Sequence, residues 1–271
     1  MFSKKLMLKL KKSLGQNFLR DNNTLNKIVS LESLSNQNIL EIGPGSGNLT
    51  NLIFKQRPKS FYLIEKDKRF YEILKEKYKR ENSLNILNKD ILDFNLNDLK
   101  EKDVIVFGNL PYNISTQILA KFIKIDYWPP FYKKIIFMFQ SEVADKIIAK
   151  PKSNNFGRIS ILTNLRLNII DNFKISRKCF FPIPKVDSKI IIFEPKNTIN
   201  YNILKINSLE KVTQLFFSKK RKMIKKTLMS IFPDYNKISR NLNIDLSSRP
   251  SELSFDTYYK ITEMYEKINK F

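Results

Sequence analysis

Residues 41–47 read Glu-Ile-Gly-Pro-Gly-Ser-Gly and hold three of the six glycines of this 271-residue chain. Ile39, Leu40 and Ile42 have the pattern of a buried strand, and residues 48–54 have the pattern of an amphipathic helix. Glycine has no Cβ, so the backbone of such a turn can approach a bound molecule closely. A strand, a glycine-rich turn and a helix start therefore predict a nucleotide-cofactor cradle, and a tight turn that binds nothing is the alternative.

The glycine spacing separates two kinds of cofactor. A dinucleotide-binding turn has the spacing G-x-G-x-x-G and directs a helix N-terminus at a pyrophosphate. Here Gly43, Gly45 and Gly47 give G-x-G-x-G, with Glu41 two positions ahead. That pattern resembles the first motif of Rossmann-like S-adenosylmethionine-dependent methyltransferases. An acidic residue at this place suits a ligand that carries an ammonium and a sulfonium.

Acidic residues follow the next two predicted strands. Glu65 comes after the strand at 60–64, where a carboxylate can accept hydrogen bonds from both ribose hydroxyls. Asp90 comes after the strand at 84–87, where it can accept the adenine amino hydrogens, with Ile91 against the ring. Ligands of open α/β sheets bind beyond the C-terminal ends of the strands, so these residues are expected to converge. A solvated carboxylate for Glu65 and a helix cap for Asp90 are the alternatives.

The fourth predicted strand runs into Gly-Asn-Leu-Pro-Tyr at residues 108–112. Asn-Leu-Pro-Tyr resembles the N/D-P-P-Y/F signature of methyltransferases that act on planar amino nitrogens. The Asn109 side-chain carbonyl and the Leu110 backbone carbonyl can each accept an amino hydrogen. Pro111 restricts the backbone that aims the second carbonyl, and Tyr112 offers a ring on which an extruded base can stack. A type I turn is the alternative for this motif alone.

Five sequence blocks occur in an order that resembles one family over nearly the whole chain. They are Lys-Ser-Leu-Gly-Gln-Asn-Phe-Leu at 12–19, the glycine loop, Phe-Gly-Asn-Leu-Pro-Tyr-Asn-Ile-Ser at 107–115, Phe-Gly-Arg at 156–158 and Pro-Lys-Val-Asp-Ser at 184–188. The family is the bacterial small-subunit (16S) rRNA adenine N6,N6-dimethyltransferases, or rRNA adenine dimethylases. They dimethylate two adjacent adenosines in a hairpin loop near the 3′ end of that RNA.

The resemblance implies a cofactor and site residues. The cofactor is S-adenosyl-L-methionine, in a pocket lined by Asn17 and Leu19 and continued by Gly43, Glu65, Asp90 and Asn109. Phe180 matches the aromatic residue that sandwiches the target base opposite Tyr112. Phe181 stands where the family usually has a small or polar residue, so the assignment between Phe180 and Phe181 stays open.

The chain has a formal charge of +23, from 49 lysines and arginines against 26 acidic residues. Such a balance attracts phosphate without sequence preference. Lysine, asparagine and isoleucine are abundant throughout, as in proteins of AT-rich genomes, so the distribution of charge is more informative than its total. Cations are dense among the lysines of 4–12 and at Lys219, Lys220, Arg221, Lys222, Lys225 and Lys226. The second group alternates with apolar residues and predicts a packed helix whose basic face docks RNA; a solvated lysine-rich face is the alternative.

Alternating strands and helices predict a doubly wound α/β sheet. The strands are expected at 38–42, 60–64, 84–87, 103–107 and 134–139, with helices such as 66–79 and 115–124. Residues 168–174 and 188–193 are expected to close the sheet as an antiparallel pair. We expect a Rossmann-like methyltransferase domain over 1–197, a linker at 194–198 and a small all-helical RNA-docking domain over 198–271. Its helices are expected at 209–217, 220–231, 235–242 and 251–268.

Several classes of protein are disfavoured by composition. The chain has no histidine and one cysteine, Cys179, which excludes an internal disulfide and disfavours a metal site. No apolar run is long enough for a membrane span. The N-terminus lacks the apolar core of a signal peptide, so we expect a cytoplasmic protein, with an organellar targeting remnant as the alternative. We expect a monomer that acts on small-subunit rRNA or the pre-ribosomal small subunit.

Two other functions compete with small-subunit dimethylation. The related large-subunit rRNA adenine methyltransferases, which give macrolide resistance, share the cofactor loops; Leu110, the preceding Phe107-Gly108 and the block at 185–188 favour the small-subunit enzymes. A non-catalytic RNA-binding or ribosome-assembly factor can also retain the fold. The intact motif at 109–112 and the full cofactor loop argue against that last possibility.

Overall fold

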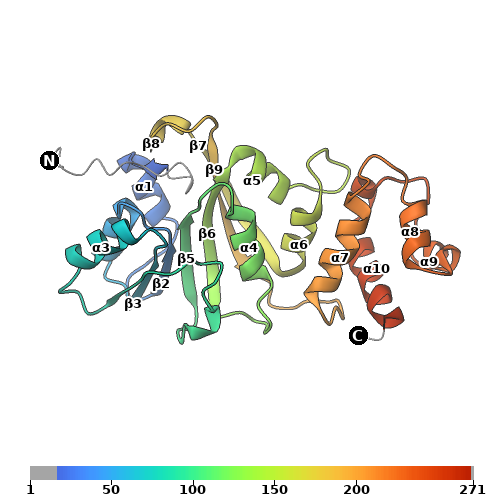
Figure 1. The fold of residues 1–271 in the computed structure, drawn as a ribbon, viewed down its shortest axis with the longest axis horizontal. Helices are drawn as coiled ribbons and strands as arrows, with labels where there is room; N and C mark the ends of the chain where they lie inside the picture. Colours follow the sequence, from blue (N-terminus) through green and yellow to red (C-terminus); the bar gives the residue numbers. More distant parts are fainter. Residues whose placement is uncertain (1–16, 270–271) are drawn as a thin grey trace. The chain divides into compact units, whose positions relative to one another are not determined.

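A mostly parallel seven-stranded sheet dominates the first of two compact units in the computed structural model, which describes residues 17–269 (Figure 1). The strand order is β4 (Leu84–Leu87), β3 (Ser60–Ile64), β2 (Asn38–Ile42), β5 (Val104–Asn109), β6 (Tyr132–Gln140), β9 (Ser188–Pro195) and β7 (Leu167–Ile175). The five strands from β4 to β6 are parallel, β9 pairs antiparallel with β6, and β7 lies beyond β9 at the edge. The predicted Rossmann-like fold is confirmed.

One face of the sheet packs against three helices, α1 (Asn22–Val29), α2 (Asn48–Lys55) and α3 (Lys68–Lys77). The strand residues in this core alternate along the chain and include Ile39, Phe61, Leu63, Ile105, Phe107, Ile136 and Met138. Side chains at i and i+2 lie on one face of a strand, so Glu41, Glu65 and Asn109 fall on this same face. Because β3, β2 and β5 are parallel neighbours, the three polar side chains meet at one edge of the sheet.

A separate two-stranded sheet joins two distant segments. β1 (Phe18–Leu19) pairs antiparallel with β8 (Phe180–Phe181), with Phe18 opposite Phe181 and Leu19 opposite Phe180. The backbone N–H groups of Arg20 and Asp21 extend the pairing by donating to the carbonyl of Cys179, at 2.9 and 3.3 Å. No local pattern in the sequence predicted this pairing, because it depends on residues about 160 positions apart.

The second unit is helical and comprises Ala120–Pro129, Asp145–Asn168 and the chain from Pro195 onward. Its helices include α6 (Arg158–Arg166), α7 (Ile206–Phe217), α8 (Lys225–Ile231), α9 (Tyr235–Asn241) and α10 (Phe255–Ile268). The buried ring of Phe156 packs against Phe217, Phe255 and Tyr258, so the Phe-Gly-Arg block at 156–158 serves the core of this unit. The unit therefore takes in chain before residue 198 as well as after it.

The remaining elements are short helices and turns. They are α4 (Ser115–Ile123), α5 (Ser141–Ile147) and the 3₁₀ turns η3 (Leu96–Asp98), η4 (Arg177–Cys179) and η5 (Pro250–Glu252). The expected linker at 194–198 is shorter than predicted, because Glu194 and Pro195 complete β9. None of the described helices has both the length and the apolar character that a membrane span requires.

The predicted helix at 220–231 is wrong over its first part. α8 begins at Lys225, and residues 219–222 form a turn in which the Lys222 N–H donates to the Lys219 carbonyl at 2.8 Å. Four successive cations repel one another within a helical turn. The buried Ile224 also donates its N–H to the carbonyl of Ser248, at 2.9 Å, rather than into a continuous helix.

Candidate active site

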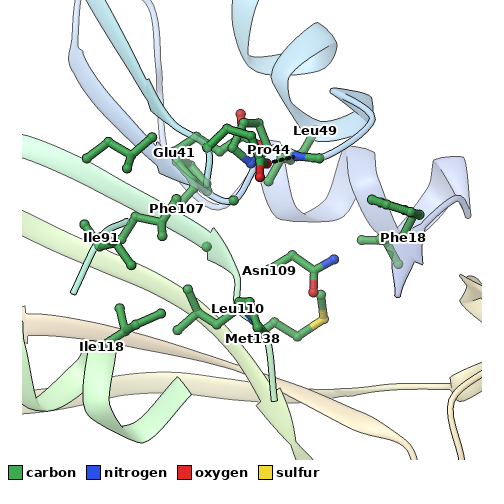
Figure 2. A pocket seen from close by; sticks show the side chains of 18 of the residues that line it. Phe18, Glu41, Pro44, Leu49, Ile91, Phe107, Asn109, Leu110, Ile118 and Met138 are labelled. Atoms are coloured by element: carbon green, nitrogen blue, oxygen red, sulfur yellow. Dashed lines mark hydrogen bonds between the residues drawn. The ribbon is translucent and has the colours of Figure 1, made fainter. Parts of the chain in front are cut away.

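A cleft of about 190 Å³ opens in the first unit at the C-terminal ends of β2, β3 and β5 (Figure 2). Most of the sequence-predicted site residues line it: Asn17, Leu19, Gly43, Gly45, Glu65, Asp90, Ile91, Asn109, Leu110, Pro111 and Tyr112. Two of the predicted residues, Gly47 and Phe180, do not line the cleft. The topology thus brings five separate segments of the chain to one concave surface.

The three loop glycines have left-handed backbone conformations, with φ of 66° at Gly43, 52° at Gly45 and 75° at Gly47. A Cβ at Gly43 would meet no atom within 4 Å, so the backbone there borders open space. A Cβ at Gly45 would lie 2.5 Å from the ring of Phe18. A Cβ at Gly47, the N-cap of α2, would lie 2.8 Å from Leu74 of α3. Gly43 therefore keeps the cleft open, whereas Gly47 allows close packing behind the loop.

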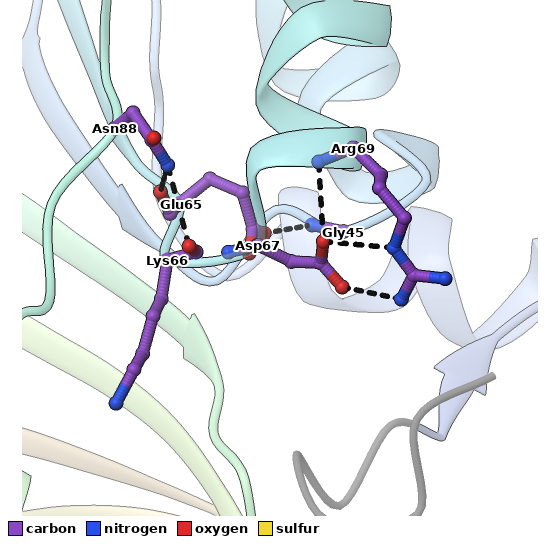
Figure 3. Close-up of polar contacts among 6 residues, drawn as sticks. All are labelled: Gly45, Glu65, Lys66, Asp67, Arg69 and Asn88. Carbon is purple, nitrogen blue, oxygen red and sulfur yellow. Dashed lines mark hydrogen bonds and ion pairs between the residues drawn. The ribbon is translucent and has the colours of Figure 1, made fainter.

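Glu65 ties the end of β3 to the glycine loop (Figure 3). Its Oε2 accepts a hydrogen bond from the Gly45 N–H at 2.9 Å, and its Oε1 accepts one from the Asp67 N–H at 2.7 Å. Burial raises the pKa of Glu65, while these backbone donors act in the opposite direction. The side chain of the nearby Asp67 makes other contacts: it caps α3 and binds Arg69 Nε and Nη2 at 3.0 and 2.6 Å.

Glu41 is a buried acid on the wall of the cleft, with 3% of its surface exposed. Its Oε2 accepts a hydrogen bond from the Thr50 hydroxyl at 2.7 Å. Burial raises the pKa of Glu41 to about 8, and the charge of Glu65 acts in the same direction. The carboxyl is therefore mostly protonated at neutral pH. The sequence showed an acidic residue before the glycine loop, but it did not predict that this residue is buried. The burial involves Thr50 of α2, which contacts Glu41 only in the folded chain.

Asp90 and Ile91 also line the cleft. Asp90 Oδ2 binds Lys66 Nζ at 2.6 Å, and Oδ1 accepts from the Leu92 N–H at 2.9 Å. The helix cap offered as the alternative for Asp90 is not observed, because the residues that follow form a turn, which the Leu92 bond closes. Ile91 is buried and presents an apolar wall.

Asn109 ends β5 with its side chain held in one orientation. Its Nδ2 donates to the backbone carbonyl of Asn17 at 3.1 Å, which leaves Oδ1 as the acceptor on the other side of the amide. Asn48 makes the matching hydrogen bond from α2, donating from Nδ2 to the Leu19 carbonyl at 2.8 Å. Sequence reasoning missed this role of Asn48. The two amides fix the segment 17–19 over the cleft.

Tyr112 is anchored by the block at 184–188. Its hydroxyl lies 2.9 Å from the Oγ of Ser188, and burial raises the pKa of the phenol. Asp187, next to that serine, accepts from the Arg177 N–H at 2.9 Å and pairs with Lys174 at 2.8 Å. The block thus positions the tyrosine, a role that the sequence alone did not reveal.

Phe180 and Phe181 have opposite environments. Phe180 is 3% exposed and belongs to the core cluster with Leu19, Met138 and Ile190. Phe181 is 39% exposed. The difference follows from the alternation of side chains along β8.

Comparisons with known proteins identify the family. The sequence model of the ribosomal RNA adenine dimethylase family matches residues 7–267. The chain belongs to this family. It is accordingly an rRNA adenine methyltransferase, as the order of the sequence blocks predicted.

Curated relatives are similar over nearly their whole length. The chain is 42% identical over 266 residues to the ribosomal RNA small subunit methyltransferase A of Pelagibacter ubique, covering 97% of this chain and 99% of the relative. It is 38% identical over 252 residues to the protein of that name from Mycoplasma mobile, covering 92% and 95%.

Two solved structures support the fold. A dimethyladenosine transferase from Plasmodium falciparum matches with a TM-score of 0.74 and 24% identity, covering 93% of this chain and 98% of that one. The 23S rRNA methyltransferase ErmE matches with a TM-score of 0.67 and 22% identity, covering 92% and 99%.

Proposed function

We propose that this rRNA adenine methyltransferase transfers methyl groups from S-adenosyl-L-methionine to N6 of two adjacent adenosines. The target is the hairpin loop near the 3′ end of small-subunit rRNA, and the reaction belongs to ribosome biogenesis. The observation that carries the proposal is the placement of Asn109, with an oriented acceptor oxygen, in the same cleft as the glycine loop and Glu65.

The residues of the cleft fit the proposed cofactor. Open space beside Gly43 admits a ligand against the loop backbone. Glu65 has further lone pairs with which to accept from ribose hydroxyls, since each of its oxygens uses one for a backbone N–H. Asp90 and Ile91 offer an acceptor and an apolar wall to an adenine ring. Residues 17–19 cover the ligand. The bound cofactor supplies an electrophilic methyl group on a sulfonium centre.

The Asn-Leu-Pro-Tyr loop orients the target nitrogen. An adenine amino group is a weak nucleophile, because its lone pair is delocalised into the ring. Acceptance of its hydrogens by Asn109 Oδ1 and the Leu110 carbonyl favours a pyramidal nitrogen with a localised lone pair. Tyr112 stacks on the base that has left the helix, and a loop nucleotide makes this extrusion inexpensive. Phe180 is assigned to the opposite face of the base, which requires the buried ring to turn out of its core cluster when RNA binds.

We assign RNA docking to the helical second unit, which contains the segment predicted as a docking domain together with chain before residue 198. Lys219, Lys220, Arg221 and Lys222 form a basic turn, and Lys225 and Lys226 begin α8. Their charges attract phosphate without reading bases, as suits folded RNA whose base edges are hidden. The lysines of 4–12 belong to the same proposal but lie outside the described residues.

The test is direct transfer. The full chain is incubated with labelled S-adenosyl-L-methionine and small subunits that lack the modification, and the labelled nucleotides are mapped. Label at two adjacent adenosines of the 3′ hairpin supports the proposal, and Asn109→Ala serves as the control for contaminating activity. Label at any other site, or none, overturns it.

A further inference from the structure

An exposed aromatic ring carries a stacked cation just outside the cleft. Phe181 is 39% exposed, and the guanidinium carbon of Arg20 lies 4.1 Å from the centroid of its ring. The two residues belong to opposite strands of the β1–β8 sheet or its extension, with backbone hydrogen bonds from Arg20 and Asp21 to Cys179. The pair is thus presented on a fixed backbone.

The position of the pair links it to the cofactor cleft. Phe181 is the register partner of Phe18, so the two side chains share one face of the small sheet. Phe18 lines the cleft and packs against Phe70, with ring centroids 5.2 Å apart. The Arg20–Phe181 pair therefore lies next to residues that cover the cofactor site, outside the core that contains Phe180.

The surroundings suit a nucleotide. Exposed cations of the adjoining segment include Lys178 and Lys185, while its acid, Asp187, is already paired with Lys174. A base can stack on an aromatic ring or a guanidinium plane, and nearby cations attract its phosphate. An apolar peptide would find less complementarity in such a charged setting.

We propose that Arg20 and Phe181 form a second stacking platform, which holds the base of a nucleotide next to the target adenosine. The inference rests on the proposed function and specifies how the RNA loop is held. Extrusion of the target adenosine unstacks its neighbour. The platform replaces that stacking and keeps the loop open while the target lies against Tyr112.

The test uses the full chain and a synthetic RNA hairpin of the small-subunit 3′ end. 2-Aminopurine replaces the nucleotide that follows the adjacent adenosines, and a second hairpin carries it on the preceding side. Stacking quenches its fluorescence. Wild type should quench one of the two probes on binding, and Phe181→Ala should abolish that quenching and weaken RNA affinity by about 5- to 100-fold, the scale of one base stacked on an aromatic ring. Phe181→Trp should restore both, and Arg20→Ala should give a smaller loss.

Ile183→Ala is the matched control, because Ile183 is 61% exposed in the same loop and has no aromatic face. It should leave quenching unchanged, and S-adenosylhomocysteine should bind all variants as it binds wild type. Normal quenching in Phe181→Ala, or equal losses in Phe181→Ala and Ile183→Ala, would overturn the platform. These readouts do not need methyl transfer. If wild type quenches normally but transfers no methyl group, the proposed function fails and the platform stands.

Discussion

At the scale of single residues, the buried Glu41 should make the free energy of unfolding depend on pH. Its pKa is about 8 in the folded chain against 4.5 for an ordinary glutamate, so folding favours the protonated form. The stabilising contribution is complete below about pH 4.5 and is lost as pH rises towards 8. Over that interval the free energy of unfolding should fall by up to about 1.4 kcal/mol per pH unit.

Glu41→Gln should flatten this decline, as measured by urea unfolding across the interval. A residual slope of the same sign should remain, because burial also raises the pKa of Glu65. Glu32→Gln is the control of opposite sign. Lys134 holds the pKa of Glu32 below its usual value, so that contribution is present above the ordinary pKa and is lost as pH falls. Parallel profiles for wild type and Glu41→Gln would refute the assignment.

A comparison of Asn109 with Asn48 can separate two roles of Asn109: accepting a hydrogen bond from the target amino group and holding the segment 17–19. Both amides hold the segment 17–19, but only Asn109 ends β5, beside the proposed position of the target nitrogen. Asn109→Ala should slow single-turnover transfer by roughly 2–4 kcal/mol of barrier, the scale for one oriented polar group. Asn48→Ala should weaken cofactor binding and leave the transfer rate of the saturated enzyme near that of wild type. Equal rates for both variants would show that Asn109 acts only by holding the segment.

At the scale of elements, we expect Gly43 of the glycine loop to matter for ligand binding and Gly47 to matter for packing of the fold. Gly43→Ala introduces a left-handed alanine, which costs about 1–2 kcal/mol, and places its methyl group in open space beside the cleft. It should weaken S-adenosylhomocysteine binding in calorimetry while the chain stays folded. Gly47→Ala adds a clash with Leu74 to a similar strain, so it should lower the melting temperature more and affect binding less. The reverse order of effects on affinity would mean that Gly47 contacts the ligand.

The basic turn at 219–222 makes a second element-scale prediction. Replacing all four cations with Gln should reduce the log–log salt slope of subunit binding by about 0.7–0.9 for each phosphate that the variant no longer neutralises. Lys225→Gln with Lys226→Gln is the comparison at the start of α8. Lys220 Nζ also binds the Asn154 carbonyl at 2.6 Å, so thermal stability is measured alongside. An unchanged slope would mean that the turn is a solvated surface and that docking occurs elsewhere.

The sequence pattern predicted those strands whose position depends mainly on residues close together in the chain. The strands β2, β3 and β4 were predicted at the residues where they occur, because each is a short apolar run with polar or turn residues beside it. The helix α6 was not predicted: five of its nine residues are buried, so no polar face marks it. The start of α8 depends on Ser248, and the burial of Phe180 depends on β1. Interactions between residues far apart in the chain cannot be predicted from a short stretch of sequence.

At the scale of the whole molecule, the fold alone does not specify the substrate. The 23S rRNA methyltransferase ErmE shares this architecture at 22% identity, so the architecture leaves the choice between ribosomal subunits open. A net charge of +23 also attracts any rRNA without preference, which makes low-salt binding uninformative. The preference for one ribosomal subunit therefore has to be measured as methyl transfer, at near-physiological salt.

We expect labelled methyl groups to enter small subunits that lack the modification and not large subunits offered in equal amount. Because the methyltransferases that give macrolide resistance act on the large subunit, expression of the chain in a macrolide-sensitive host should leave its susceptibility unchanged. Asn109→Ala, expressed at the same level, controls for effects of the protein that do not require transfer. Preferential label in large-subunit RNA, with raised macrolide tolerance that Asn109→Ala does not give, would assign the chain to the other substrate.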